Sequence, residues 1–239
     1  SDSSGNIYDL ENFIYNIKGV DINSDEGLRR INSINEGKFP FETSDKKIIE
    51  AIHDAHLTKR VSASCNTIAY VEADIIIVDV NFDLDEFNKG IKQSSFLKAI
   101  RQIANNMKPN VFILIETTVP PGTSEKIIIP EIKKILKKRN IADNNFLFAH
   151  SYERVMPGLN YLDSIKNYWR VYAGMNKRSA KICKEFLEKF IDTKNFPLME
   201  LPSIKSSELA KVMENTYRAV TISLMDEWGK FSEKIGVDL

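Results

Sequence analysis

Two polar residues near the end of the sequence are spaced so that they could act together. In the segment 206–220, SSELAKVMENTYRAV, Lys211 and Asn215 are four residues apart, so on a helix both side chains project from one face. An ammonium and a carboxamide that point at one oxygen can stabilise the negative charge that develops there when a hydride leaves or a nucleophile adds. The same spacing is common on solvated helix faces, and the spacing alone does not exclude that alternative.

Polar residues also follow two apolar runs. Thr118 lies in the segment 116–123, ETTVPPGT, and Glu153 and Arg154 lie in the segment 151–158, SYERVMPG. Open α/β sheets bind ligands at the carboxyl ends of their strands, so we expect Thr118 to contact a cofactor, water or substrate there. Glu153 and Arg154 would suit a polar ligand. The structural alternatives are a rigid Pro-Pro-Gly turn and a surface ion pair.

Asp21 ends a short β-branched run in the segment 19–23, GVDIN. A carboxylate at this position of a dinucleotide-binding fold accepts hydrogen bonds from the adenosine ribose and repels a 2′-phosphate, which favours NAD over NADP. The alternative is that Asp21 caps the helix that starts after Asn23. A GxGxxG loop would normally precede such a carboxylate, but no two glycines in the chain are separated by a single residue. We therefore expect the first strand and its loop upstream of residue 1, or lost, with a helix over 6–18.

The elements that would hold these residues alternate between strands and helices, which predicts an α/β fold with a parallel sheet. The runs at 75–78 and 111–115 are apolar on both faces, as in central strands. Strands are expected at 19–22, 61–64, 74–80, 111–116, 146–150, 170–173 and 197–201. Helices are expected at 24–36, 44–57, 92–107, 123–138 and 177–191.

A single long helix is expected from Ser203 to about Lys234, because this stretch lacks proline and its apolar residues recur with helical spacing. Lys211, Asn215 and Arg218 share one face of it. Its apolar stripe continues through Trp228 and beyond the reach of one sheet, so a following domain or a second subunit should cover it. We therefore divide the chain into a nucleotide-binding domain, 1–201, and a central helix, 202–239.

Composition excludes several classes of partner. Lys+Arg and Asp+Glu number 33 each, and no long run of one sign occurs, which argues against nucleic acid or a membrane surface as partner. Cys65 and Cys183 are far apart and suggest neither a disulfide nor a metal site, as expected in a reducing cytoplasm. His53 and His56 have helical spacing but no third ligand nearby, so no metal is expected. No apolar run of about 18 residues occurs, so a soluble protein is expected.

Taken together, these segments resemble in order and spacing the UDP-glucose/GDP-mannose dehydrogenase family. The landmarks are GVDIN, INEGKFPFE (from Ile34 to Glu42, in the stretch that begins at Ile31), EADIIIV, ETTVPPGT, SYERVMPG and SSELAKVMENTYRAV. The sequence around Glu153 resembles the branch of the family that acts on UDP-N-acetylhexosamines more than the branch that acts on UDP-glucose. The resemblance implies a Rossmann-like sheet that lacks its first strand and glycine loop, followed by a long central helix.

The resemblance also implies roles for the polar residues. The family uses NAD to oxidise the C6 alcohol of a UDP-sugar to the uronic acid, a precursor of surface polysaccharides. By resemblance Asp21 would hold the adenosine ribose, and Thr118 would position a catalytic water and the nicotinamide side. Glu153 would serve as acid and base for the acyl-enzyme stage and also contact the cofactor, while Lys211 and Asn215 would bind the C6 oxygen. The substrate contacts would include Arg154, Lys211, Asn215 and Arg218. The central helix, 203–234, would form a homodimer.

Four departures from the family pattern suggest an incomplete or degenerate form that is inactive alone. Asn81-Phe82-Asp83 replaces a PTP-like turn, SYER replaces SPER, and Glu26 stands where a basic residue often assists the adenosine end. The family's thioester-forming cysteine belongs to a GGxC motif beyond the long helix, and neither cysteine here lies in one.

Two other functions stay open on the sequence. A β-hydroxyacid dehydrogenase relative would also carry a lysine and an asparagine one turn apart on a helix after its nucleotide-binding domain. A non-catalytic module that dimerises or binds a nucleotide sugar could keep the helix without the chemistry.

Overall fold

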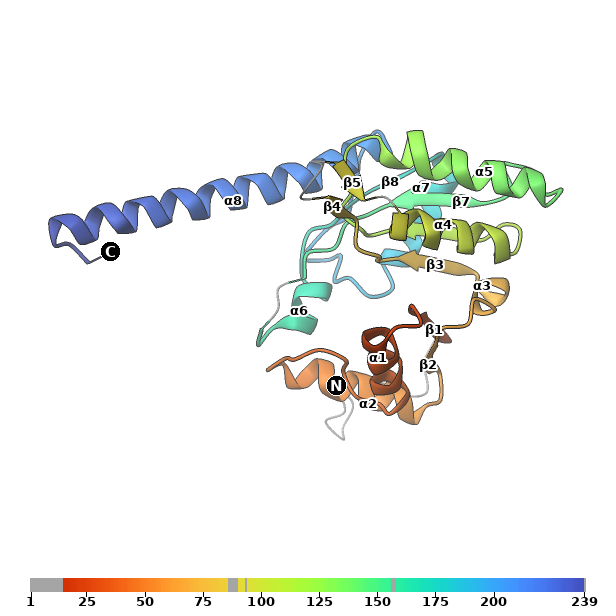
Figure 1. The fold of residues 1–239 in the computed structure, drawn as a ribbon, viewed down its shortest axis with the longest axis horizontal. Helices are drawn as coiled ribbons and strands as arrows, with labels where there is room; N and C mark the ends of the chain where they lie inside the picture. The colour runs from red at the N-terminus through yellow and green to blue at the C-terminus, as the bar shows by residue number, and fades with distance from the viewer. Residues whose placement is uncertain (1–14, 86–89, 93, 156–157, 239) are drawn as a thin grey trace. The chain divides into compact units, whose positions relative to one another are not determined.

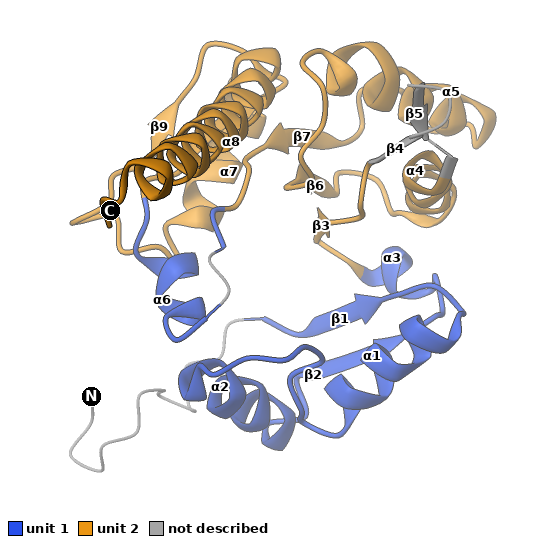
Figure 2. Cartoon of the chain, turned by 60° about the vertical axis from the view of Figure 1, so that its left-hand side comes forward, with its two compact units in different colours: residues 1–72, 154–168 blue, residues 73–153, 169–239 orange. Residues whose placement is uncertain are grey.

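The computed structural model describes residues 15–85, 90–92, 94–155 and 158–238, and the chain forms two compact units (Figure 2). Unit 1 comprises residues 1–72 and 154–168, and unit 2 comprises residues 73–153 and 169–239. The proposed division into 1–201 and 202–239 stays a prediction.

Unit 1 is built on a pair of parallel strands, β1 (Ile17–Val20) and β2 (Val61–Ser64). Its helices are α1 (Asp25–Asn35), α2 (Lys46–Leu57), α3 (Ala69–Glu72) and α6 (Tyr161–Lys166). The Ser24 hydroxyl accepts a hydrogen bond from the Gly27 N–H and so caps α1. The buried Asp45 carboxylate caps α2 through the Lys47 N–H and also accepts from the Leu162 N–H, which ties α6 to α2.

The helix expected over 6–18 is wrong where the structure tests it. Ile17 and Lys18 belong to β1, because the Ile17 N–H donates to the Arg60 carbonyl and the strand pairs with β2 from its first residue. Residues 6–14 of that prediction lie outside the described residues.

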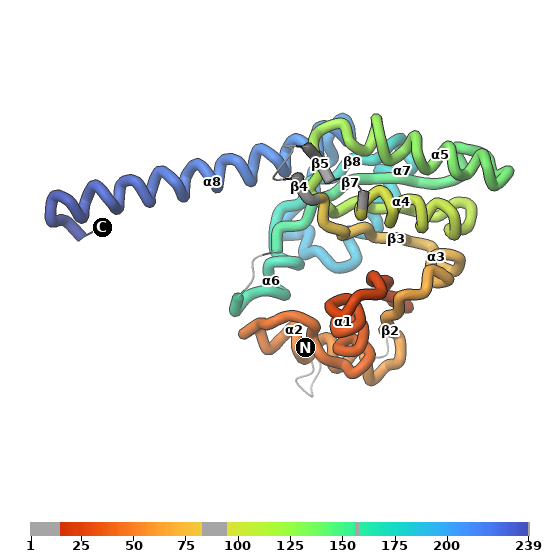
Figure 3. The backbone as a smooth tube through the Cα atoms, in the orientation of Figure 1, coloured from red at the N-terminus to blue at the C-terminus, as the bar shows by residue number. Residues whose placement is uncertain are grey.

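Unit 2 contains a five-stranded sheet in the order β3-β6-β7-β8-β9. The strands are β3 (Ile75–Val78), β6 (Phe112–Ile115), β7 (Leu147–His150), β8 (Val171–Gly174) and β9 (Met199–Glu200). β3, β6 and β7 run parallel. Around them lie α4 (Ser94–Asn106), α5 (Ile129–Lys138) and α7 (Lys177–Leu187), and a hairpin of β4 (Asp83–Asp85) and β5 (Gly90–Lys92), which the sequence did not predict. Figure 3 traces the path of the backbone through these elements.

The core of unit 2 lies on both faces of β6. Phe112 and Leu114 pack with Cys183 and Leu187 of α7. Residues one position along point to the opposite face, and Ile113 is fully buried there, so β6 is covered on both sides as its apolar run predicted. β3 differs, because it ends this sheet and its Ile77 is exposed.

Two local predictions need correction. β8 runs antiparallel to β7 rather than parallel. The connection from β7 to β8 includes residues 154–168, which belong to unit 1, and it enters β8 at the edge of the sheet where β7 ends. A parallel strand would need a connection that crosses to the opposite edge of the sheet. The helix expected over 123–138 begins with a π-helical turn, η2 (Ser124–Ile128), and α5 follows. Pro130 has no N–H to donate to the Lys126 carbonyl, which explains the change of hydrogen-bond pattern.

The long helix is confirmed as α8 (Ile204–Ile235), which extends away from the sheet of unit 2 (Figure 1). Ser203 caps its first turn by accepting the Ser206 N–H, and Gly236 ends it in the left-handed conformation with φ 76°. Only its first turns pack against β7, β8 and η2.

Buried polar contacts fix those first turns. The Glu208 carboxylate is fully buried and accepts the N–H groups of Gly122 and Ser124, at 2.5 and 2.8 Å. The Ser207 hydroxyl lies 2.8 Å from Nδ1 of the buried His150. Burial lowers the pKa of His150 to about 4, so its imidazole is neutral at neutral pH. Ser207 and Glu208 at the start of α8 therefore attach this helix to the loop after β6 and to the end of β7.

We predict that Glu208→Gln destabilises the chain by about 2 kcal/mol or more, because the amide places a donor against a buried N–H donor. The free energy of unfolding from urea denaturation measures the change. The matched control is Glu227→Gln on the exposed part of the same helix, where the cost should be within about 0.5 kcal/mol. Equal stability of the two variants would contradict the anchoring role of Glu208.

Candidate functional site

The carboxyl ends of β3, β6 and β7 meet at one edge of the sheet in unit 2. Val78, Ile115 and His150 are register partners at the ends of these parallel strands. The residues that follow them therefore lie along the same edge. They are Asp79 after β3, Glu116 to Thr118 after β6, and Ser151 to Glu153 after β7. Because β8 is antiparallel to β7, Arg170, just before β8, reaches this edge as well.

A single buried arginine holds two carboxylates at this edge. Nη1 of Arg170 donates to Oε1 of Glu116 at 2.8 Å, and Nη2 lies 3.5 Å from Oε1 of Glu153. Burial raises the pKa of Glu116 to about 7, and the charges of Glu153 and Asp79 add to this rise while Arg170 opposes it. Burial also raises the pKa of Glu153. A carboxyl with a raised pKa can both give and take a proton near neutral pH.

The two threonines of the ETTVPPGT loop differ in environment. The Thr117 hydroxyl is buried and lies within hydrogen-bond distance of the Val78 and Val80 carbonyls, which ties the loop to the end of β3. Thr118 is exposed at the same edge. Thr117 is therefore the structural residue of the pair, and Thr118 is the one that a ligand could contact.

α8 brings Lys211 to Glu153. The Lys211 ammonium donates to the backbone carbonyl of Glu153 at 2.9 Å and lies 4.9 Å from the centre of the Tyr152 ring. That cation–π contact gives a role to the tyrosine that makes the segment SYER rather than SPER. Asn215 lies one turn further along α8 and is exposed, as is Arg218, which pairs with Glu214 at 3.0 Å.

Arg154 is the first residue of the segment 154–168, which belongs to unit 1. Its guanidinium lies 5.3 Å from the centre of the Tyr168 ring, also in unit 1. The carboxylate of Glu153 is paired with Arg170 instead. The roles of Thr118, Glu153, Arg154, Lys211, Asn215 and Arg218 stay predictions.

Asp21 follows β1 in unit 1, and its N–H donates to the Ser64 carbonyl at the end of β2. Its carboxylate pairs with Arg30 of α1 through Nε at 2.6 Å and Nη2 at 3.1 Å. The hydrogen bond from Arg30 lowers the pKa of Asp21, so the carboxylate is ionised. Asp21 does not cap α1, since Ser24 does. The Asp21 carboxylate is partly exposed, and its role as the ligand of the adenosine ribose stays a prediction.

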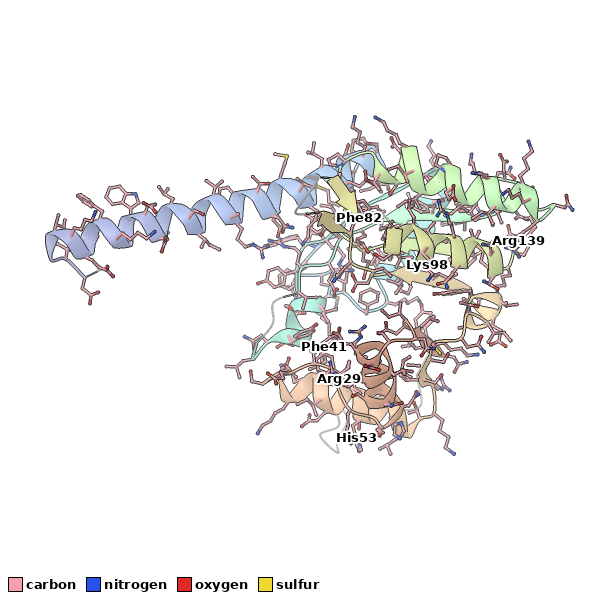
Figure 4. All side chains as sticks on the ribbon, viewed as in Figure 1. Arg29, Phe41, His53, Phe82, Lys98 and Arg139 are labelled. Carbon is pink, nitrogen blue, oxygen red and sulfur yellow. The ribbon has the colours of Figure 1, made fainter. Side chains whose placement is uncertain are left out.

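The landmark INEGKFPFE forms part of a pocket of about 540 Å³ in unit 1. Phe39, Phe41 and Ile49 supply apolar walls, and His53 of α2 lies beside them; Phe41 and His53 are labelled in Figure 4. Gly37 has φ 71°, and a Cβ there would meet the His56 side chain at 2.9 Å, so the turn requires glycine.

Two residues of the arginine cluster had no role in the sequence analysis. Glu116 stood inside a landmark, and Arg170 only began an expected strand. A signal for both existed, because each is a charged residue directly next to an apolar strand that must be buried. Cys183 adds no nucleophile here, since it is buried and burial raises its pKa to about 12, and Cys65 belongs to unit 1. Within the described residues, no three His, Cys, Asp or Glu side chains gather as metal ligands.

The comparisons with known proteins identify the family. Residues 9–191 match the family model described as UDP-glucose/GDP-mannose dehydrogenase family, NAD binding domain. Residues 205–239 match the central domain of the same family. The chain belongs to the UDP-glucose/GDP-mannose dehydrogenase family. The predicted family is therefore confirmed, and NAD is the cofactor that the matched domain binds.

Curated relatives include two archaeal proteins named UDP-N-acetyl-D-mannosamine dehydrogenase. The protein from Methanococcus maripaludis is 31% identical over 235 residues, which cover 96% of this chain and 49% of the relative. The protein from Methanocaldococcus jannaschii is 31% identical over 227 residues, which cover 94% and 48%. The chain thus spans about half the length of the curated relatives it matches.

Solved structures of dehydrogenases share the fold. A GDP-mannose dehydrogenase from Pseudomonas aeruginosa has a TM-score of 0.80 at 20% identity, over 96% of this chain and 50% of that chain. A UDP-D-ManNAc dehydrogenase from Pyrococcus horikoshii has a TM-score of 0.79 at 24% identity, over 93% and 50%. These likenesses confirm the predicted α/β, Rossmann-like fold class. None of the helices among the described residues is both long and apolar enough to span a membrane.

The raised pKa of Glu116 predicts a pH-dependent stability. Its pKa is about 7 in the folded chain and 4.5 ordinarily, so its contribution is full below about pH 4.5 and is lost as the pH rises through 7. A glutamine at this position cannot ionise, so Glu116→Gln does not lose stability in this way. The Tm of the variant minus the Tm of the unchanged chain should therefore grow as the pH is raised from 5 to 8. The corresponding difference in the free energy of unfolding should grow by up to about 1.4 kcal/mol per pH unit.

Differential scanning calorimetry across this pH range measures the effect. His150 titrates with the opposite sign between pH 4 and 6.5, but it is present in both proteins and cancels in the difference. Glu185→Gln on the exposed face of α7 serves as the control. A Tm difference that stays constant from pH 5 to 8 would show that Glu116 is ionised throughout.

Proposed function

We propose that this chain is the cofactor-binding and central-helix part of an NAD-dependent nucleotide-sugar 6-dehydrogenase. Its substrate would be a UDP-N-acetylhexosamine, oxidised at the C6 alcohol to the uronic acid for surface polysaccharide synthesis. The observation that carries the proposal is the contact between Lys211 of α8 and the backbone of Glu153, beside the buried Arg170 and Glu116. In this contact a residue of the matched central domain, Lys211, binds a residue of the matched NAD-binding domain, Glu153, at one edge of the sheet.

The residues at this edge have the properties that such an oxidation requires. NAD, when bound, accepts the hydride from C6. Lys211 is held with its charge next to Glu153, where an ammonium would stabilise negative charge on the C6 oxygen. Burial raises the pKa of Glu153, so its carboxyl binds a proton more readily than an exposed glutamate does, as a general base requires. Thr118 is exposed at the same edge and can orient water or ligand.

Two observations support the proposed substrate class, the names of the curated relatives and the sequence of the segment SYERVMPG. The curated relatives at 31% identity are named UDP-N-acetyl-D-mannosamine dehydrogenases. SYERVMPG is similar to the branch acting on UDP-N-acetylhexosamines, and Arg154 and Arg218 are the cations that we assign to the substrate. Asn215 would add a donor toward the C6 oxygen from the face of α8 that carries Lys211.

We predict that the chain binds NAD at one saturable site, and that Asp21→Ala weakens this binding about tenfold because a charge-assisted hydrogen bond to the ribose is lost. Isothermal titration calorimetry measures both values. Arg101→Ala is the control, because Arg101 pairs with Glu131 on the helices α4 and α5. Absence of saturable NAD binding by the unchanged chain would refute the proposed function.

We also infer a homodimer built on α8. Beyond Lys211 the helix exposes large apolar side chains that recur along its length (Figure 4). Trp228 is 52% exposed, and its ring contacts that of Phe231 at 5.7 Å between centres. The other members of this stripe are Met213, Tyr217, Val220, Leu224 and Ile235. Burying each such side chain contributes about 1.5–3 kcal/mol, so a second copy that covers the stripe would bind firmly.

We predict that light scattering after gel filtration gives twice the chain mass of 27.3 kDa. Trp228→Glu should yield monomers or aggregates, because it places a charge in the apolar contact. Trp169→Glu is a matched control, since Trp169 is also exposed but its ring contacts Phe196 and is not part of the α8 stripe, and it should leave the dimer intact. If the unchanged chain is a monomer at micromolar concentration, the proposed homodimer is wrong and another domain should cover the stripe.

A further inference from the structure

One arginine of α1 binds the carboxylate that follows β1. The side chain of Arg30 reaches back to Asp21 through Nε and Nη2. Its third nitrogen, Nη1, donates to Glu26 at 2.7 Å. A positive charge is therefore held between two carboxylates at the end of β1.

The geometry of this pair constrains the Asp21 carboxylate. Arg30 donates to both of its oxygens, a two-pronged arrangement that fixes orientation as well as charge. The Ile22 N–H donates to Oδ1 as well, at 2.7 Å. A carboxylate has about four acceptor sites, so three are occupied and one remains on Oδ2. That remaining site can accept a hydrogen bond from one ribose hydroxyl.

The charges around Arg30 decide what else could bind. Asp21 and Glu26 each carry one negative charge and Arg30 carries one positive charge, so the three together carry one net negative charge. Such a group repels a 2′-phosphate. Without Asp21, Arg30 would be freed on two of its nitrogens, and a guanidinium near this position is how dinucleotide folds accept a 2′-phosphate.

We propose that Arg30 sets the cofactor choice at the adenosine end of the site. With Asp21 in place, Arg30 orients the carboxylate for the ribose hydroxyl of NAD and is itself neutralised by it. Without Asp21, Arg30 becomes the partner of a 2′-phosphate. This inference rests on the proposed function, because it requires that the chain bind a nicotinamide dinucleotide.

A merely structural ion pair makes a different prediction. A partly exposed pair contributes little to stability, and its removal would leave the preference between NAD and NADP unchanged. The experiment must therefore compare the two cofactors across a double-mutant cycle rather than measure stability or NAD affinity alone.

The cycle consists of the unchanged chain, Asp21→Ala, Arg30→Ala and the double variant, each titrated with NAD and with NADP by calorimetry. We expect the unchanged chain to favour NAD and Arg30→Ala to weaken NAD binding several-fold. Asp21→Ala should bind NADP at least tenfold more tightly than the unchanged chain does, and the double variant should lose that gain. The gained NADP affinity should fall as salt is raised, since a charge contact carries it.

Arg101→Ala is again the control, as an arginine paired with a glutamate outside the site, and circular dichroism confirms that each variant is folded. If the double variant binds NADP as tightly as Asp21→Ala, Arg30 does not read the ribose and the inference is wrong while the proposed function stands. If the unchanged chain binds neither cofactor, the proposed function fails and the inference fails with it.

Discussion

The described part of unit 2 depends on one buried carboxylate. Glu208 lies in the second turn of α8, accepts the N–H groups of Gly122 and Ser124, and has no exposed surface. Burying a carboxylate raises the free energy of the folded chain unless its oxygens accept hydrogen bonds. These two hydrogen bonds therefore favour the observed packing of α8 on the ETTVPPGT loop over packings that would break them. Lys211 follows Glu208 by three residues, less than one turn, and is thereby delivered to Glu153. The anchor and the proposed catalytic lysine belong to one short segment for this reason.

The edge of the sheet balances charge against burial. Three carboxylates, from Asp79, Glu116 and Glu153, act on one another there, and Arg170 is the buried cation among them. The result is a pair of carboxyls with raised pKa values rather than a set of fixed negative charges. Lys211 donates to the backbone carbonyl of Glu153, which places its positive charge beside this group.

Most of the fold was predictable because strand burial and helix periodicity are local properties of the sequence. The apolar run of β6 and the uninterrupted spacing of α8 defined their elements almost to the residue. The direction of β8 was not predictable, because it depends on the edge at which the connection between β7 and β8 returns to the sheet, which no local pattern reports. The Arg170 cluster escaped notice for a related reason, since its partners are 54 and 17 residues away in the chain. Lys211 and Asp21 were found because each lies in a landmark with its own spacing.

Unit 1 holds one cation between two carboxylates at the end of β1. On α1, positions 26 and 30 lie one turn apart on one face, so Arg30 can bridge Glu26 and Asp21 at once. Judged from its position in the sequence alone, Glu26 only adds a negative charge near Asp21. In the folded helix that charge is paired with Arg30, which also fixes both oxygens of Asp21. Residue types at single positions do not show this arrangement, because it forms across one helical turn and a strand end.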